Sequence, residues 1–242
     1  MSGNSLTRIR VGILQADSVR VELQARYGDY PEMIETILRK ANPKIKFRHY
    51  NVESGAYPQD LDECDGYVIT GSKKSVYDDE VWIRVLMGFV RQLHEKQKKL
   101  VGICFGHQII AQALGGETKA AEVGWGVGIH NSRIIGKKDF MASDLQTFGL
   151  LVSHKDQVAT LPDGAELLAT SEFCPNAMYT IGDHVLAFQG HPEFTRAYSR
   201  DLIEVRREIL GEDTASAGLA SLEKCPDGEL VAQWIMSFLE TQ

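Results

Sequence analysis

The sequence predicts an α/β protein with a mostly parallel central sheet flanked by helices and a small antiparallel addition in its second half. Up to residue 116, short apolar strand patterns alternate with amphipathic helix patterns, which is typical of a parallel sheet covered on both faces. After that residue, short strand patterns follow one another directly, as in antiparallel strands. The 242 residues are sufficient for one large core, and we predict a single domain over residues 1–242.

In the first half, runs of β-forming apolar residues predict four strands: Arg8–Ala16, Lys46–Asn51, Asp65–Ser72 and Lys99–Ile103. A helix is predicted to begin at the cap residue Asp29, because a proline and Glu32 follow at favourable positions, and to end at Asn42. Apolar residues at helical spacing predict two further helices, over residues 81–96 and 105–114. This order indicates a flavodoxin-like sheet.

The second half is predicted to contain short strands over residues 123–130, 149–154, 166–170, 177–181 and 184–189. A hairpin turn at Gly182-Asp183 separates the last two. Two helices are predicted to close the chain, with a loop over Gly211–Pro226 between them, and the second begins at a cap on Asp227. The first helix carries its apolar residues on one stripe: Tyr198, Leu202, Val205 and Ile209.

Composition and charge exclude several classes of function. A net charge of −7 gives no basic footprint for nucleic acid, and no apolar run approaches the roughly 18 residues that span a membrane. The N-terminal residues lack the apolar core of a signal peptide, so we expect a cytoplasmic protein. The four cysteines lie far apart, which argues against a disulfide framework or a zinc site and fits a reducing compartment.

The residues around Cys104 combine a strand, a sharp turn and a helix start in a pattern typical of a nucleophile. Gly102 and Gly106 stand two residues to either side, as in the Gly-x-nucleophile-x-Gly turn with cysteine in place of serine. The partial positive charge at the helix start favours a thiolate, and the N–H of Phe105 is free to face a developing oxyanion. The alternative is a packing turn with an inert buried cysteine.

A second polar group follows the last predicted strand. His191 and Glu193 are separated by Pro192, and side chains two residues apart in extended chain point the same way. The carboxylate can then accept the imidazole N–H, orient a general base and stabilise its cation. Taken alone, this trio is typical of a surface turn. Together with Cys104 it predicts a Cys-His-Glu triad.

Gly102–Gln108 and Gly190–Glu193 resemble the two signatures of class I glutamine amidotransferase domains. The resemblance extends over nearly the whole chain and includes Thr70-Gly-Ser72, where the family places an oxyanion loop. It is strongest to free-standing members, the GMP-synthase-like amidotransferases and the plant γ-glutamyl peptidases, which share the pattern of residues 70–83.

The resemblance implies a role for each matching residue. Cys104 would attack the δ-carbonyl of glutamine or another γ-glutamyl amide and form a γ-glutamyl thioester. His191 would take the thiol proton and pass it to the leaving amine, and Glu193 would orient His191. The backbone N–H groups of Gly71 and Phe105 would hold the oxyanion.

The family also suggests which residues contact the substrate. Gln108, Ser153 and Asp156 are the candidates for the γ-glutamyl head group. His154 either lines the same pocket or packs beside it. Lys155 replaces a glycine of the GMP synthetase relatives, so the approach of the backbone to the substrate is expected to differ here.

Two other side chains have open roles. His107 lies three residues after the cysteine on the same predicted helix, which favours a structural role over that of the base. Trp125 either covers the pocket or packs as a core aromatic. No histidine spacing typical of a metal site occurs, and we predict neither a metal nor a cofactor.

The predicted activity is that of a glutamine amidotransferase-like hydrolase, a cysteine-dependent amidohydrolase acting on a small γ-glutamyl substrate. The alternatives are a γ-glutamyl peptidase that needs no partner, an ammonia donor to a synthetase subunit on another chain, and a catalytically idle binding or regulatory protein. The chain ends at Gln242, soon after the triad, so no fused synthetase is expected. The amine side of the substrate and the oligomeric state are left open.

Overall fold

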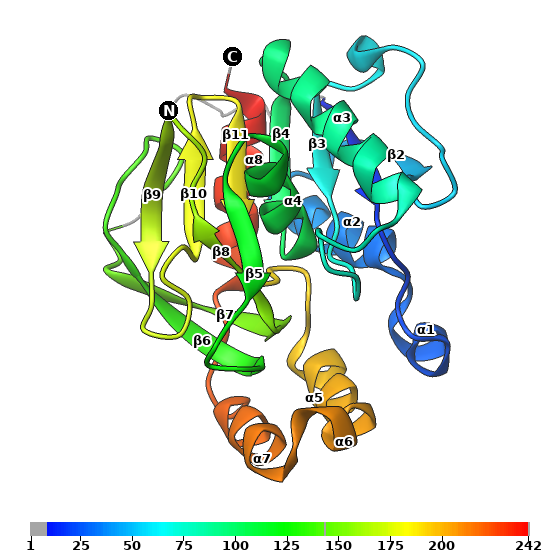
Figure 1. Cartoon of the computed structure of the whole chain (residues 1–242). Helices are drawn as coiled ribbons and strands as arrows, with labels where there is room; N and C mark the ends of the chain where they lie inside the picture. The colour runs from blue at the N-terminus through cyan, green and yellow to red at the C-terminus, as the bar shows by residue number, and fades with distance from the viewer. Residues whose placement is uncertain (1–8, 143, 242) are drawn as a thin grey trace.

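The computed structural model describes residues 9–142 and 144–241. The predicted first residue of the first strand, Arg8, and the two ends of the predicted domain lie outside this part of the chain. Helices cover both faces of a twisted central sheet (Figure 1), which confirms the predicted α/β class. Within the described residues, no helix has the length and apolar character to cross a membrane.

The central sheet, as far as the chain is described, has nine strands in the order β2-β1-β3-β4-β11-β10-β9-β6-β7. The first five run parallel: β2 (Lys46–Asn51), β1 (Arg10–Gln15), β3 (Gly66–Ile69), β4 (Lys99–Ile103) and β11 (Val185–Phe188). Their carboxyl ends therefore share one edge of the sheet, where open α/β sheets bind ligands. Cys104 follows β4 and His191 follows β11, its neighbour.

The other four strands continue the same sheet in antiparallel order: β10 (Met178–Ile181), β9 (Ala165–Thr170), β6 (Gly126–Ile134) and β7 (Thr147–His154). This confirms the predicted antiparallel addition. β5 (Glu117–Ala120) and β8 (Asp156–Thr160) form a separate antiparallel pair that the sequence did not predict.

Two helices pack on each face of the parallel part (Figure 1). α2 (Tyr30–Ala41) and α8 (Gly228–Glu240) cover one face, and α3 (Val81–Glu95) and α4 (Phe105–Ala113) cover the other. Successive strand residues alternate between the two cores, so Val68 packs with α2 and α8 whereas Ile69 packs with α3 and α4. Asp29 and Glu32 form the predicted capping box at the start of α2.

Four further helices lie around the ligand edge of the sheet: α1 (Val21–Tyr27), α5 (Arg196–Val205), α6 (Arg207–Leu210) and α7 (Glu212–Ser221). A short 3₁₀ turn, η1, covers Leu61–Glu63. Helices α5 and α7 pack on β6, and α1 contacts α5. In Figure 1, α5, α6 and α7 lie below the carboxyl ends of the strands, and α1 lies to their right.

Three predictions for the closing helices need correction. The loop predicted over Gly211–Pro226 is wrong in its first part, which α7 occupies. In the predicted stripe, Val205 and Ile209 are exposed, because the helix breaks at Arg206 into α5 and α6. Asp227 does precede α8, but its carboxylate accepts the N–H of Gly149 and does not cap the helix.

Candidate active site

The turn between β4 and α4 holds Cys104 in a strained backbone conformation. Its φ of 54° and ψ of −103° are unusual for a residue with a side chain and cost about 1–3 kcal/mol. A Cβ at Gly102 would lie 2.6 Å from the carbonyl oxygen of Gly106, and a Cβ at Gly106 would lie 2.5 Å from that of Ile69. The two glycines therefore allow the close approach of helix and strands that the sequence pattern predicts.

The end of β11 reaches the same turn. The backbone N–H of Cys104 donates to the carbonyl oxygen of Phe188 at 2.8 Å, and three residues later the N–H of His191 donates to Leu151 of β7 at 2.8 Å. The segment from Phe188 to His191 is thus bonded at its start to Cys104, the residue after β4, and at its end to β7.

His191 and Glu193 form the predicted pair, and both residues are buried. The Nδ1 atom of His191 lies 2.7 Å from Oε1 of Glu193, and the ring of Phe194 stacks on the imidazole with 3.8 Å between centroids. Burial lowers the pKa of His191, but the charges of Glu193 and Cys104 and their hydrogen bonds outweigh it, so that the pKa lies above its ordinary value. The pair therefore provides an oriented base that holds a proton strongly.

Gly71, on the loop after β3, lies against both reactive side chains. A Cβ at this position would lie 2.9 Å from Cε1 of His191 and 3.7 Å from Cβ of Cys104. Phe105 is the first residue of α4, so its N–H has no partner inside the helix. Both predicted oxyanion donors thus belong to segments that adjoin Cys104.

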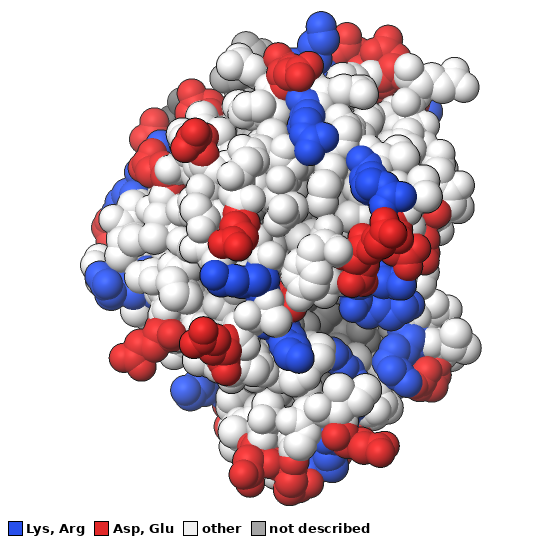
Figure 2. All heavy atoms as spheres, viewed as in Figure 1, with Lys and Arg blue, Asp and Glu red and all other residues white. Residues whose placement is uncertain are grey.

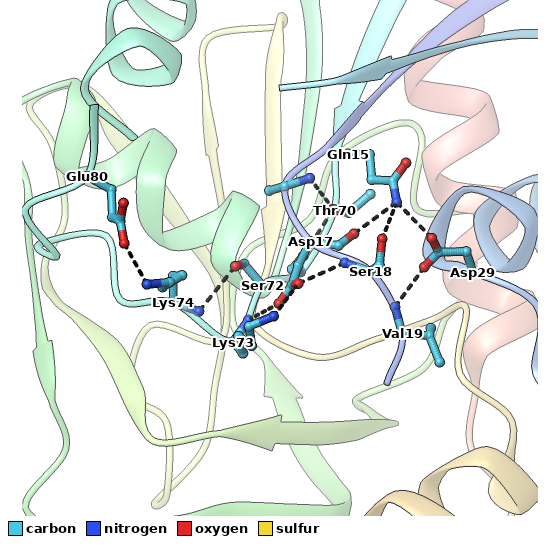
Figure 3. Close-up of polar contacts among 12 residues, drawn as sticks. Gln15, Asp17, Ser18, Val19, Asp29, Thr70, Ser72, Lys73, Lys74 and Glu80 are labelled. Atoms are coloured by element: carbon cyan, nitrogen blue, oxygen red, sulfur yellow. Dashed lines mark hydrogen bonds and ion pairs between the residues drawn. The ribbon is translucent and has the colours of Figure 1, made fainter. Parts of the chain in front are cut away.

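Asp17 anchors the loop that carries Gly71 (Figure 3). Its buried carboxylate accepts hydrogen bonds from the backbone N–H of Lys73 at 2.8 Å, from the Lys73 ammonium at 2.9 Å and from the N–H of Ser18 at 2.8 Å. Thr70 adds a second link, because its hydroxyl accepts the N–H of Ala16 and donates to the carbonyl of Gly71. These bonds tie the loop after β3 to the loop after β1.

Cys104 and His191 open into a cavity of about 810 Å³ at the ligand edge of the sheet. The four predicted substrate residues also line this cavity: Gln108, Ser153, His154 and Asp156. In Figure 2 the hollow above α5–α7 is bordered by basic side chains. The cavity brings together most of the residues that the sequence predicts for the site, including Gly71. Glu193 and Phe105 do not line it: both are buried behind its wall.

Polar contacts hold the candidate substrate residues in place. Gln108 donates to the backbone carbonyl of Asp156 at 2.8 Å, and the carboxylate of Asp156 accepts bonds from the hydroxyls of Ser75 and Tyr77. Burial lowers the pKa of His154 to about 3, so its ring is neutral at physiological pH. Its Nε2 atom is buried and has no hydrogen-bond partner within the described residues.

The structure places His107 and Trp125, the two side chains whose roles were left open, in different surroundings. His107 lies away from the cavity, where its Nε2 bonds to the carbonyl of Asn176 at 2.9 Å and its ring packs on Tyr179. Burial lowers the pKa of His107 to about 3, which supports a structural role. Trp125 lines the cavity and carries the guanidinium of Arg206 over its ring at 4.4 Å.

Among the cavity residues that the sequence analysis did not place in the site are Asp17, Tyr30 and Arg206. Asp17 follows the carboxyl end of β1, a position where α/β sheets place ligand loops, so topology could have indicated it. Tyr30 and Arg206 stand at a helix start and a helix end, and no sequence pattern marks them.

An α/β sheet in which a strained cysteine turn and a carboxylate-bound histidine follow adjacent parallel strands defines a class of proteins, and a family model identifies the family. The family described as glutamine amidotransferase class-I matches residues 25–204. This chain belongs to that family.

Individual relatives agree with this membership. A glutamine amidotransferase-like protein of Schizosaccharomyces pombe is 32% identical, covering 95% of this chain and 98% of the relative. Gamma-glutamyl peptidase 3 of Arabidopsis thaliana is also 32% identical, over 79% of this chain and 81% of its own. The crystal structure of a glutamine amidotransferase from Thermotoga maritima superposes with a TM-score of 0.79 over 97% of this chain and 100% of that chain, at 19% identity.

Proposed function

We propose that this protein hydrolyses the γ-glutamyl amide bond of glutamine or a related γ-glutamyl compound, with Cys104, His191 and Glu193 as its catalytic residues. One observation carries the proposal. A cysteine on a strained, glycine-flanked turn meets a buried, carboxylate-bound histidine at the wall of a cavity large enough for a small molecule.

The reaction proceeds in two halves. His191 takes the proton of Cys104, the sulfur attacks the δ-carbonyl carbon, and the N–H groups of Gly71 and Phe105 bind the oxyanion. Collapse of this intermediate breaks the C–N bond, and His191 gives its proton to the leaving amine, so that a γ-glutamyl thioester remains on Cys104. Water, deprotonated by His191, then attacks the thioester and releases glutamate and the free thiol. Glu193 stabilises the imidazolium in each half.

A second candidate is the same chemistry in the service of a synthetase subunit on another chain, which would take the released ammonia. The names of the relatives include both amidotransferase-like proteins and γ-glutamyl peptidases, so they support either use. Glutamate release from glutamine that rises several-fold on addition of a synthetase would favour the ammonia donor. Release from γ-glutamyl peptides by the purified chain alone favours the peptidase.

The decisive variant is Cys104→Ala, with Cys225→Ala as its matched control because Cys225 is an exposed free cysteine. We expect Cys104→Ala to lower kcat at least about 1,000-fold, since it removes the atom that forms the thioester. The control should retain wild-type activity. The measurement is glutamate released from glutamine and from γ-glutamyl dipeptides. Undiminished turnover by Cys104→Ala would reject the mechanism.

A further inference from the structure

Arg206 is a half-buried cation at the cavity wall. It stands where α5 ends, its Nη1 donates to the hydroxyl of Ser153 at 2.7 Å, and its guanidinium lies 4.4 Å from the centre of the Trp125 ring. Among the residues that the structure describes, no carboxylate forms an ion pair with it. Burial lowers its pKa, which shows that water solvates the charge incompletely.

Three of the four other cations at this cavity have acidic partners, whereas Lys155, like Arg206, has none among the described residues. Lys73 pairs with Asp17, Lys74 pairs with Glu80, and Arg20 pairs with Glu22. A guanidinium has five N–H donors in a planar fork. Within the described part of the chain, one N–H of Arg206 donates a hydrogen bond, to Ser153, and the others have no protein acceptor. The remaining donors suit the planar carboxylate of a ligand, which a guanidinium binds in bidentate fashion.

The surroundings of Arg206 indicate which part of the substrate it meets. Of the head-group candidates, Gln108 and Asp156 bond to each other through the Asp156 carbonyl. The third, Ser153, accepts the hydrogen bond of Arg206, which comes from the junction of α5 and α6 and packs on Trp125, so Arg206 lies beside the head-group residues. Apolar residues also line this cavity, and two of them are well exposed: Val21 at 82% and Ile209 at 63%. Ammonia released from glutamine has neither a carboxylate nor an apolar part for such a surface.

We infer that Arg206 and Trp125 form a subsite for the free carboxylate of the amino acid that leaves, and that the preferred substrates are γ-glutamyl dipeptides with an apolar second residue. This inference rests on the proposed function. It adds to that function a residue, Arg206, that selects the amine side of the substrate. Arg206 acts by binding the leaving amino acid and takes no part in proton transfer.

The test compares γ-glutamyl-leucine with γ-glutamyl-leucinamide, which differ only in the carboxylate, and includes glutamine as a third substrate. We expect the wild-type protein to prefer the free acid over the amide by about 10- to 100-fold in kcat/KM, the range for a hydrogen-bonded charge pair. Arg206→Met should remove this preference, and Arg206→Lys should retain part of it. Because the ratio is taken within one protein preparation, partial misfolding does not affect it.

Arg200→Met is the matched control, since Arg200 is an exposed arginine on the same helix and does not line the cavity. It should keep the wild-type preference. A preference that persists in Arg206→Met would overturn the inference. An equal loss towards all three substrates would also overturn it, because Arg206 would then bind the α-carboxylate that they share.

Binding to the Cys104→Ala protein separates the subsite from the chemistry. Calorimetric titration should give a Kd about 10- to 100-fold lower for γ-glutamyl-leucine than for its amide, and equal values when Arg206→Met is added. Selective binding without turnover by the wild-type protein would reject the proposed function and keep the subsite. Turnover with equal Kd values would reject the subsite alone.

Discussion

At the scale of single residues, the site depends on a histidine whose two ring nitrogens have separate tasks. Nδ1 bonds to Glu193, which leaves Nε2 for Cys104. The stacked ring of Phe194 restricts rotation of the imidazole, so the orientation does not rest on one hydrogen bond. Of the groups that raise the pKa of His191, Glu193 contributes most.

The variant Glu193→Gln tests this contribution. The amide keeps a hydrogen-bonding oxygen but removes the charge, so the pKa of His191 should fall and the alkaline limb of the kcat/KM profile should move to lower pH. We expect kcat to fall roughly 100- to 10,000-fold, as when the acid of a serine-protease triad is replaced by its amide. The measurement is a pH–rate profile for both proteins, with the surface variant Glu229→Gln as control. An unchanged alkaline limb would show that the carboxylate does not set the basicity of His191.

The sequence could single out these residues because each belongs to a short local motif, and their catalytic roles stay a prediction. A glycine-flanked cysteine and a His-Pro-Glu trio each specify a local geometry, and the parallel sheet places them together. Arg206 could not be found in this way. Its position depends on a helix break after Val205 and on the partners Trp125 and Ser153, which are distant in sequence.

At the scale of elements, the crossing of α4 over β3 and β4 decides where the thiol stands. Gly102 and Gly106 allow contacts that no other residue could accommodate, because the atoms opposite them are backbone atoms that cannot move aside. Gly88, inside α3, differs from them. A Cβ there would have no heavy atom within 4 Å.

These glycines predict opposite effects of alanine. Gly106→Ala should destabilise the protein by about 3 kcal/mol or more and abolish activity, because helix and strand must separate. Gly88→Ala should stabilise it by up to about 1 kcal/mol through the higher helix propensity of alanine, with activity unchanged. Thermal or denaturant unfolding of both variants, together with glutamate release, provides the comparison. Normal stability of Gly106→Ala would contradict the packing argument.

Helix α7 and strand β5, which the sequence failed to predict, bury no large apolar side chain. Helix α7 buries only Ala215 and Gly218, and the latter packs so closely that a Cβ would lie 2.6 Å from Val127. A helix that packs through small residues leaves no amphipathic pattern. Strand β5 buries Thr118 alone, so it shows no alternation either. The larger elements were predicted because their apolar periodicity is clear.

At the scale of the whole molecule, buried histidines make stability depend on pH in two opposite directions. His107 and His154 are neutral in the folded protein down to about pH 3, because burial lowers each pKa to about 3. In the unfolded chain they bind protons below about pH 6.5, so each destabilises the fold as pH falls from there. His191 has the opposite sign, because its raised pKa adds stability at low pH that is lost as pH rises through the folded value.

We therefore expect His107→Gln to flatten the acid side of the stability curve. Between pH 4 and 6, the free energy of unfolding of the variant should depend on pH by up to about 1.4 kcal/mol per unit less than that of the wild-type protein. Glutamine can preserve the bond to the carbonyl of Asn176, which limits other losses. Urea unfolding at several pH values measures the two slopes. Parallel curves would contradict the assignment of His107 as a buried neutral ring.

The pairing of β4 with β11 has a consequence for synthesis of the protein. These neighbouring strands lie in opposite halves of the chain, so the thiol at the end of β4 emerges from the ribosome long before the imidazole that follows β11. Under the proposed mechanism, a nascent chain would carry the nucleophile without its base. We therefore expect reactivity towards γ-glutamyl substrates only once the second half has been translated and inserted beside the first.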